Sequence, residues 1–281
     1  MNTQQRIGTD ISHFDLEFDD FIDGTEIIEI HDNIAVVSYL CPDYDPFNPR
    51  EGDPFGKMVY FDTDYLIGDE QMPAHCKEDF LKELTRDCKD FAGQIEYWEE
   101  YYKPNPFLEI IRNNPNLDDD QAEEIAEETA RANIENIINQ AMEQCILIPY
   151  NLYTQSFHIL KPGTPGDLDI EDYNGVIYAT PEMIIKEYDE NTPETRKKAL
   201  RLLKAEIEEY ALYASGETYN LTVETFENAE PDPGSPPIWE QIDMDNLGCC
   251  LGHEYAEEEL KSMHASAIKY ALEKYGLHKA A

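Results

Sequence analysis

Residues 117–145 read LDDDQAEEIAEETARANIENIINQAMEQC and carry the clearest helical pattern of the chain. The stretch follows Pro115 and opens with three aspartates, which interact favourably with the positive end of a helix dipole. Its later half places apolar side chains three or four residues apart, at Ile134, Ile138, Ala141 and Cys145. This spacing predicts a long helix that buries its second half and projects its first half.

The first half of the same helix is acidic. Seven carboxylates fall within eleven residues: Asp118, Asp119, Asp120, Glu123, Glu124, Glu127 and Glu128. At about 100° per residue, the five from Asp120 onward share one stripe. A rise of about 1.5 Å per residue spaces the seven charges roughly 2.4 Å apart along the axis, against roughly 1.7 Å in duplex DNA. The stripe is either an ordinary solvated face or a surface that imitates nucleic acid.

The charge of the whole chain is extreme. Sixty acidic residues against 21 Lys and Arg give a formal net charge of −39 over 281 residues. A compact protein this far from neutrality stores repulsive energy. Adaptation to high salt, binding of many cations, or a surface resembling nucleic acid would each make that repulsion tolerable. The negative sign disfavours direct binding to nucleic acid and to anionic membranes.

Basic residues are unevenly placed, which favours particular anionic faces over general solvation. Arg6 is the sole Lys or Arg within residues 1–49, and Arg131 is the sole one within residues 113–160. By contrast, five basic residues gather between Arg196 and Lys204. We expect this cluster to form the polar face of a helix or to meet the acidic face of another copy, which leaves a homo-oligomer open.

The pattern of the remaining segments predicts an α+β fold, with short antiparallel strands in the N- and C-terminal parts around a mostly helical central segment. Glu26 to Leu40 is rich in β-branched residues and predicts two strands with a turn at residues 31–33. Lys77 to Tyr102 has helical spacing. Thr192 before Pro193 predicts the start of another helix, which ends at Gly216.

Three parts follow from this reading: a β-rich part over 1–76, a helical subdomain over 77–145 and an α+β part over 146–281. Apolar runs fall short of the roughly 20 residues that span a bilayer. Residues 1–10 lack the basic and apolar regions of a signal peptide. We therefore expect a soluble protein inside the cell.

A second acidic segment lies near the N-terminus. Residues 14–23 read FDLEFDDFID, a pattern that fits a strand and a helix equally well. Its carboxylates make it the second candidate for an anionic contact surface: Asp15, Glu17, Asp19 and Asp20.

No pattern in the sequence indicates a catalytic site, a metal site or a cofactor. Nucleophile-elbow, phosphate-loop and dinucleotide motifs do not occur. The stretch from Asp167 to Gly175 fails the calcium-loop pattern, because its sixth position is Asp172 and its twelfth is Tyr178. The six cysteines of the chain are scattered and lack zinc-ligand spacing. The sequence thus favours a protein that is not an enzyme.

Several short motifs resemble an uncharacterised family of small proteins associated with bacteriophages and mobile elements. They lie in order along the chain: His31-Asp32, Asn48-Pro49-Arg50-Glu51, Asp53, Gly56, Met58, Leu66, Gly68-Asp69, Ile148-Pro149-Tyr150, Leu152-Tyr153, Gly175-Val176-Ile177-Tyr178, Glu209-Tyr210, Ser215-Gly216-Glu217, Tyr219, Gly248-Cys249-Cys250-Leu251-Gly252 and Glu254-Tyr255-Ala256. The resemblance implies a phage context, carries no activity with it, and makes residues 77–145 an insertion relative to shorter relatives.

Phage context and acidity together suggest an anti-defence inhibitor. The expected partner is a bacterial defence protein complex with a basic nucleic-acid-binding groove, in the host bacterial cytoplasm. The inhibitor would bind it through a DNA-mimicking surface. The alternatives are a phage assembly protein with cation-dependent self-association, and an enzyme with a diffuse carboxylate site.

Overall fold

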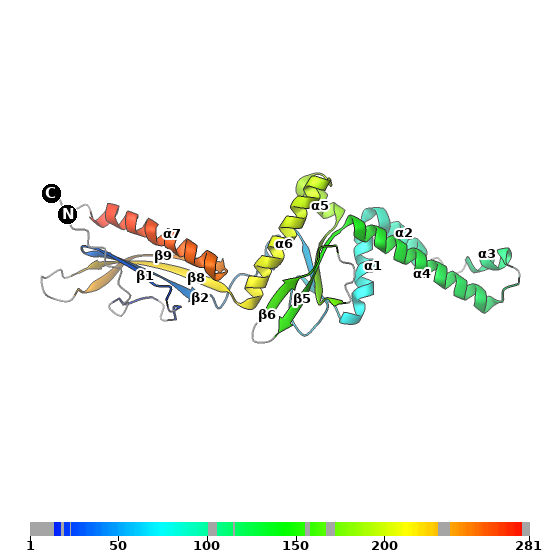
Figure 1. Cartoon of the computed structure of the whole chain (residues 1–281), viewed down its shortest axis with the longest axis horizontal. Coiled ribbons are helices and arrows are strands. Elements are labelled where there is room, and N and C mark those ends of the chain that lie inside the picture. The colour runs from blue at the N-terminus through cyan, green and yellow to red at the C-terminus, as the bar shows by residue number, and fades with distance from the viewer. Residues whose placement is uncertain are drawn as a thin grey trace. The chain divides into compact units, whose positions relative to one another are not determined.

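The computed structural model describes residues 14–17, 20–22, 24–100, 106–114, 116–154, 158–166, 172–229 and 237–276. Helices and strands alternate in blocks, so the fold class is α+β, as the sequence predicts. The chain forms two compact units (Figure 1). Unit 1 combines residues 1–48 with 215–281, and unit 2 comprises residues 49–214. The three sequence-based parts cut across these units because strand pairing joins the two ends of the chain.

Unit 1 contains an antiparallel sheet with the order β1-β2-β8-β9. Its strands are β1 (Ile27–His31), β2 (Ile34–Pro42), β8 (Thr218–Asn228) and β9 (Trp239–Leu251). The expected hairpin over residues 26–40 is confirmed, with Asp32 in the left-handed region at its turn (φ 52°). β9 was not predicted, because most of its side chains are exposed and its pattern lacks an apolar alternation.

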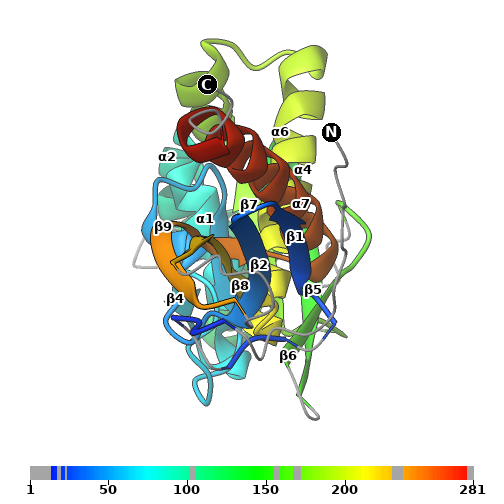
Figure 2. The ribbon, with the colours of Figure 1, turned by 90° about the vertical axis from the view of Figure 1, so that its left-hand side faces the viewer.

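Helix α7 (His253–Ala271) covers one face of this sheet (Figures 1 and 2). It ends in a π-helical turn, η4 (Leu272–Gly276). Side chains of β2 alternate between the two faces: Val36 and Leu40 pack with α7, whereas Val37 and Tyr39 pack with Phe14 on the other side. The buried Phe14 lies 5.0 Å from Phe226 between ring centroids, so the N-terminal segment is anchored to the second face.

Unit 2 contains a second sheet with the order β4-β3-β7-β5-β6. Its strands are β3 (Lys57–Tyr60), β4 (Glu70–Gln71), β5 (Ile146–Thr154), β6 (His158–Pro162) and β7 (Gly175–Ala179). All pairings are antiparallel except β3 with β4. The central β7 is buried along its whole length, as expected for a strand covered on both faces.

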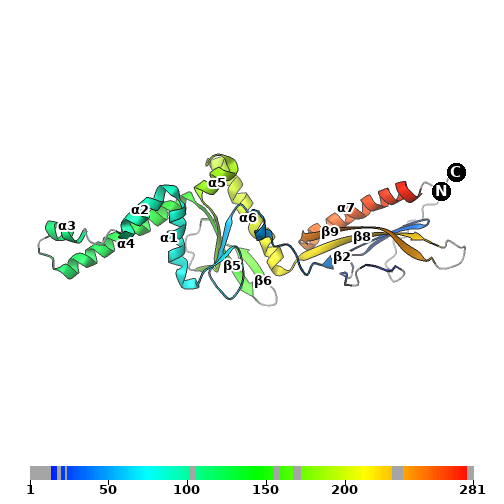
Figure 3. The ribbon, with the colours of Figure 1, turned by 180° about the vertical axis from the view of Figure 1, so that it is seen from behind.

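Helices cover both faces of the second sheet (Figure 3). Helices α1 (Lys77–Asp87), α2 (Lys89–Glu100) and α4 (Asp119–Gln144) share a core with Val59 and Tyr178. Helices α5 (Pro181–Tyr188) and α6 (Pro193–Ser215) share the opposite core with Met58 and Ile177. Neighbouring strand residues therefore enter different cores, which fixes the register of the sheet.

The helical segment within 77–145 differs from the sequence-based expectation at one point. Lys77 to Tyr102 was predicted as one helix, but Cys88 is extended (ψ 107°) and separates α1 from α2. The break lets Leu84 and Ile95 enter the same core. The long helix α4 agrees with the prediction, and the short helix α3 (Pro106–Asn113) precedes it. Short 3-10 turns lie at η1 (Pro49–Glu51) and η2 (Ala74–Cys76).

None of the helices in the described part of the chain is long and apolar enough to span a membrane.

Gly175 in β7 is expected to tolerate no side chain. A Cβ added there would lie 2.6 Å from the carbonyl oxygen of Val59 and 2.3 Å from Cζ of Tyr150, so alanine would force two buried groups apart. Gly175→Ala should lower the free energy of unfolding by about 1–3 kcal/mol, measured by urea denaturation.

Gly93→Ala is the matched control for this prediction. Gly93 is exposed in α2 and has nothing within 4 Å of an added Cβ. There alanine should stabilise the protein by about 0.5–1 kcal/mol. Equal effects of the two substitutions would contradict the packing argument.

Candidate functional site

The start of α4 is fixed by its own first residues. Asp118 is the N-cap, and its carboxylate accepts a hydrogen bond from the backbone N–H of Gln121 (2.9 Å). The side chain of Gln121 in turn accepts from the backbone N–H of Asp118 (3.2 Å), which completes a capping box. The carboxylate of Asp118 is therefore committed to the helix start and is less available to a partner than the other acids.

The first half of α4 has one buried face and one acidic face. Ala122, Ala126 and Ala130 are buried at a spacing of four residues. The acids predicted as a contact surface are all exposed: Asp118, Asp119, Asp120, Glu123, Glu124, Glu127 and Glu128. The sequence-based prediction of a buried second half is confirmed at Ile138, Ala141 and Cys145.

These seven carboxylates are not neutralised within the described part of the chain, where none of them takes part in an ion pair. The described ion pairs of unit 2 involve other acids, such as Glu78 with Lys82 (3.0 Å) and Glu99 with Arg86 (2.6 Å). The acidic face of α4 therefore presents a row of solvated negative charges that could replace phosphates against Lys and Arg of a partner. We refer to Asp119, Asp120, Glu123, Glu124, Glu127 and Glu128 as the acidic stripe.

A groove lies directly beside the acidic stripe, between α1, α2 and α4. Its volume is about 760 Å³, and Glu127 of the stripe is one of its lining residues. Leu81, Trp98 and Ile134 line it as partly buried apolar side chains that pack on the core of unit 2. The pattern of the sequence did not indicate the groove, because its walls come from three helices up to about sixty residues apart.

The second predicted acidic segment lies in unit 1, whereas the acidic stripe belongs to unit 2. Its described residues form neither helix nor strand, and Asp15, Glu17 and Asp20 are exposed, while Asp19 lies outside the described residues. The backbone N–H of Glu17 donates to the carboxylate of the buried Glu224 (3.2 Å). Burial raises the pKa of Glu224, and this backbone contact helps to hold the segment on the sheet.

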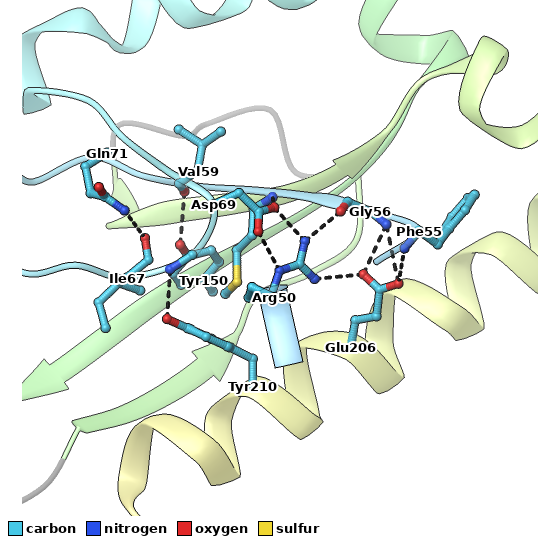
Figure 4. A network of polar contacts seen from close by, with 12 residues as sticks. Arg50, Phe55, Gly56, Val59, Ile67, Asp69, Gln71, Tyr150, Glu206 and Tyr210 are labelled. Atoms are coloured by element: carbon cyan, nitrogen blue, oxygen red, sulfur yellow. Dashed lines mark hydrogen bonds and ion pairs between the residues drawn. The ribbon is translucent and has the colours of Figure 1, made fainter. Parts of the chain in front are cut away.

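Some of the short motifs quoted from the sequence, all from unit 2, meet around Arg50 (Figure 4). The Arg50 guanidinium donates to both carboxylate oxygens of Asp69 (2.8 and 2.6 Å), to Glu206 (2.9 Å) and to the carbonyl of Gly56 (2.6 Å). Its side chain is only 3% exposed. The network ties the loop before β3, the loop before β4 and helix α6 together, so these motif residues build the unit rather than a reactive centre.

Neighbouring groups extend the same network. The backbone N–H groups of Phe55 and Gly56 donate to Glu206 (2.7 and 3.0 Å), and that of Gly68 donates to the hydroxyl of Tyr210 (2.9 Å) (Figure 4). The sequence pattern does not reveal this network, because Arg50 and Glu206 are 156 residues apart in the chain.

A serine and a histidine of unit 1 have the geometry of a catalytic nucleophile and its base, but both are inaccessible to a substrate. Ser38 Oγ lies 2.7 Å from Nδ1 of His264, and Nε2 of His264 lies 3.8 Å from a carboxylate oxygen of Glu29. Ser38 of β2 is fully buried, and His264, which belongs to α7, is 5% exposed. Burial lowers the pKa of His264, with the nearby His31 acting in the same direction and Glu29 opposing it. These residues are a packed polar pair of the core.

Metal-binding clusters of His, Cys, Asp or Glu do not occur among the residues that the structure describes. Most of the calcium-loop candidate, residues 167–171, lies outside them. The cysteines are unbridged, and Cys88 lies 3.4 Å from Cys145 between sulfur atoms in the core of unit 2.

Comparison with protein-family models, with curated proteins and with solved structures finds no match.

Arg50 is expected to be a major source of stability in unit 2. Arg50→Met would leave Asp69 and Glu206 without their counter-charge, and removing one partner of a buried ion network costs about 3–5 kcal/mol. Urea denaturation of both proteins measures this loss. Arg86→Met is the control, since Arg86 also pairs with two glutamates but is 29% exposed. It should cost no more than about 1 kcal/mol. Similar losses for both variants would contradict the assignment.

His264 should make unit 1 less stable in mild acid. Its pKa in the folded protein is below the ordinary 6.5, so the folded state binds fewer protons than the unfolded state does. Its contribution to stability is therefore full above pH 6.5 and falls as the pH drops below that value. Unfolding of wild type and His264→Gln, followed by fluorescence of Trp239 in a Trp98→Phe background, tests this. The histidine protein should lose more stability between about pH 7 and pH 5; parallel curves would contradict the prediction.

Proposed function

We propose that this protein is a phage-encoded, non-enzymatic inhibitor of a bacterial nucleic-acid-targeting defence system in the host cytoplasm. It binds a basic nucleic-acid-binding groove of the defence complex through the acidic stripe of α4, which occupies the place of a DNA backbone. The phage setting rests on the motif resemblance given above, and the mode of binding rests on the surface of unit 2.

The observation that carries the proposal is the exposure of the whole stripe. Glu123, Glu124, Glu127 and Glu128 lie in solvent along the helix and have no ion-pair partner among the described residues. An ordinary solvated helix face commonly alternates charges of both signs at spacings of four residues. Here Arg131 is the one basic residue within α4 itself. Such a field speeds association with a basic partner and makes it depend on salt.

Self-assembly is the second candidate, and one observation favours it. Lys197, Lys198, Arg201 and Lys204 are exposed on α6, so the same unit carries a basic helix face as well as an acidic one. Another copy could pair the two faces. This alternative predicts an oligomer whose size changes with salt or divalent cations, which size-exclusion chromatography with light scattering would reveal.

Charge reversal of the stripe tests the inhibitor proposal. Tagged protein is used to capture partners from bacterial lysates that carry defined defence systems, and the rate of association with the captured complex is then measured over a salt series. Replacing Glu123, Glu124, Glu127 and Glu128 by Lys should slow association by at least about tenfold at low salt and flatten the salt dependence. Inhibition of DNA cleavage by the complex should fall in parallel.

The matched control reverses four exposed glutamates elsewhere in unit 2: Glu187, Glu190, Glu194 and Glu208. Both variants then have the same net charge, so a difference between them reports the position of the charge. Association that is unchanged in the stripe variant, or reduced equally in both, would overturn the proposal. Recovery of only the protein itself or of virion components would favour assembly.

A further inference from the structure

The groove beside the acidic stripe combines an apolar floor with charged walls. Leu81 of α1, Trp98 of α2 and Ile134 of α4 contribute the apolar part, within a volume of about 760 Å³. This size lies in the range of about 300–1,000 Å³ that is typical of ligand sites, which are largely apolar and carry a few oriented polar groups. The groove is therefore large enough to receive several side chains of a partner.

The charges around the groove are predominantly negative. Four glutamates line it against two basic residues, Lys82 and Arg131. Lys82 is already paired with Glu78 (3.0 Å), and Glu99 with Arg86 (2.6 Å). Glu127, Glu135 and Arg131 are exposed and have no ion pair among the described residues. Two negative charges and one positive charge at the rim are therefore uncompensated, and their sum is negative.

We propose that this groove receives an amphipathic, basic segment of the partner protein, with apolar side chains against Trp98 and Ile134 and Lys or Arg against Glu127 and Glu135. The inference rests on the proposed function and deepens it by naming the chemistry of the partner. An acidic or nucleic-acid ligand would be repelled at the rim, and a neutral apolar ligand would leave the rim unused. A helix with one apolar and one basic face satisfies both features.

Such a contact would supply the selectivity that charge alone lacks. A row of carboxylates attracts any basic surface, because backbone electrostatics are independent of sequence. Apolar side chains buried at the centre of an interface contribute most of its binding energy and its discrimination. Glu127 belongs to both the stripe and the groove, so one partner segment can follow the stripe and enter the groove.

Fluorescence of Trp98 reports occupancy of the groove directly. The chain has two tryptophans, so a Trp239→Phe background leaves Trp98 as the single probe. The ligand is a synthetic Leu/Lys amphipathic helical peptide of about four turns, or about 14 residues. A Lys/Ser peptide of equal charge and a Leu/Glu peptide of equal apolar face are the controls. The Leu/Lys peptide should shift the Trp98 emission to shorter wavelength with saturation, and bind at least about tenfold more tightly than either control.

Two asparagines of α4 provide a matched pair of variants. Asn139 and Asn136 are both exposed, but only Asn139 is among the residues that line the groove. Asn139→Phe should fill the groove and weaken the Leu/Lys peptide by at least about fivefold, whereas Asn136→Phe should leave its affinity unchanged. Equal affinities for the Leu/Lys and Lys/Ser peptides, or equal effects of the two variants, would overturn the inference.

The peptide measurement contains no defence protein, so the two proposals can fail separately. If the Leu/Lys peptide binds specifically but the charge-reversed stripe variant still inhibits, the groove proposal is supported and the DNA-mimic function is refuted. If inhibition depends on the stripe but Asn139→Phe changes neither peptide binding nor partner binding, the proposed function is supported and the groove is refuted as the contact site.

Discussion

The pairing of β2 with β8 is the contact on which unit 1 depends. Nine residue pairs join the two strands, from Ile34 with Glu227 to Pro42 with Tyr219. The two strands are nearly 180 residues apart in the chain, so closing this loop has a substantial entropic cost that must be recovered by burial on both faces of the sheet. β2 meets the requirement with a side chain for each face in alternation, and every residue from Ile34 to Cys41 is buried. Residues 49–214 lie between the paired strands in sequence and form a unit with its own cores.

Within unit 2, a cation is buried and paired, whereas the acids of the stripe are exposed and have no ion pair among the described residues. The buried cation Arg50 binds two carboxylates and a carbonyl inside the unit, where an unpaired charge would be costly. The acids of the stripe stay in solvent, where repulsion between neighbouring carboxylates is screened. A net charge of −39 is therefore compatible with a folded chain. The same solvated carboxylates would attract a basic surface.

In the proposed interaction, the acidic stripe would act through long-range forces and the groove through short-range forces. Exposed carboxylates act over about 10 Å at ordinary ionic strength and accelerate encounter. The apolar residues of the groove would act only on contact and would set the rate at which the proposed partner dissociates. α4 can offer both because its buried face rotates along the helix. Alanines are buried in the first half, and larger residues enter the core of unit 2 in the second.

The sequence by itself determined the local elements, the α+β class and the acidic face of α4. Periodicity, caps and charge are properties of near neighbours, and Asp118, Thr192 and Gly216 mark helix ends through such local interactions. It could not indicate β9, whose exposed pattern has no apolar alternation, nor the break at Cys88, which exists because α1 and α2 fill one core. Only the tertiary structure decided that the two chain ends form one unit, that Arg50 meets Glu206, and that Trp98 and Ile134 line a groove. These contacts join residues that are far apart in the chain, and burial in three dimensions selects them.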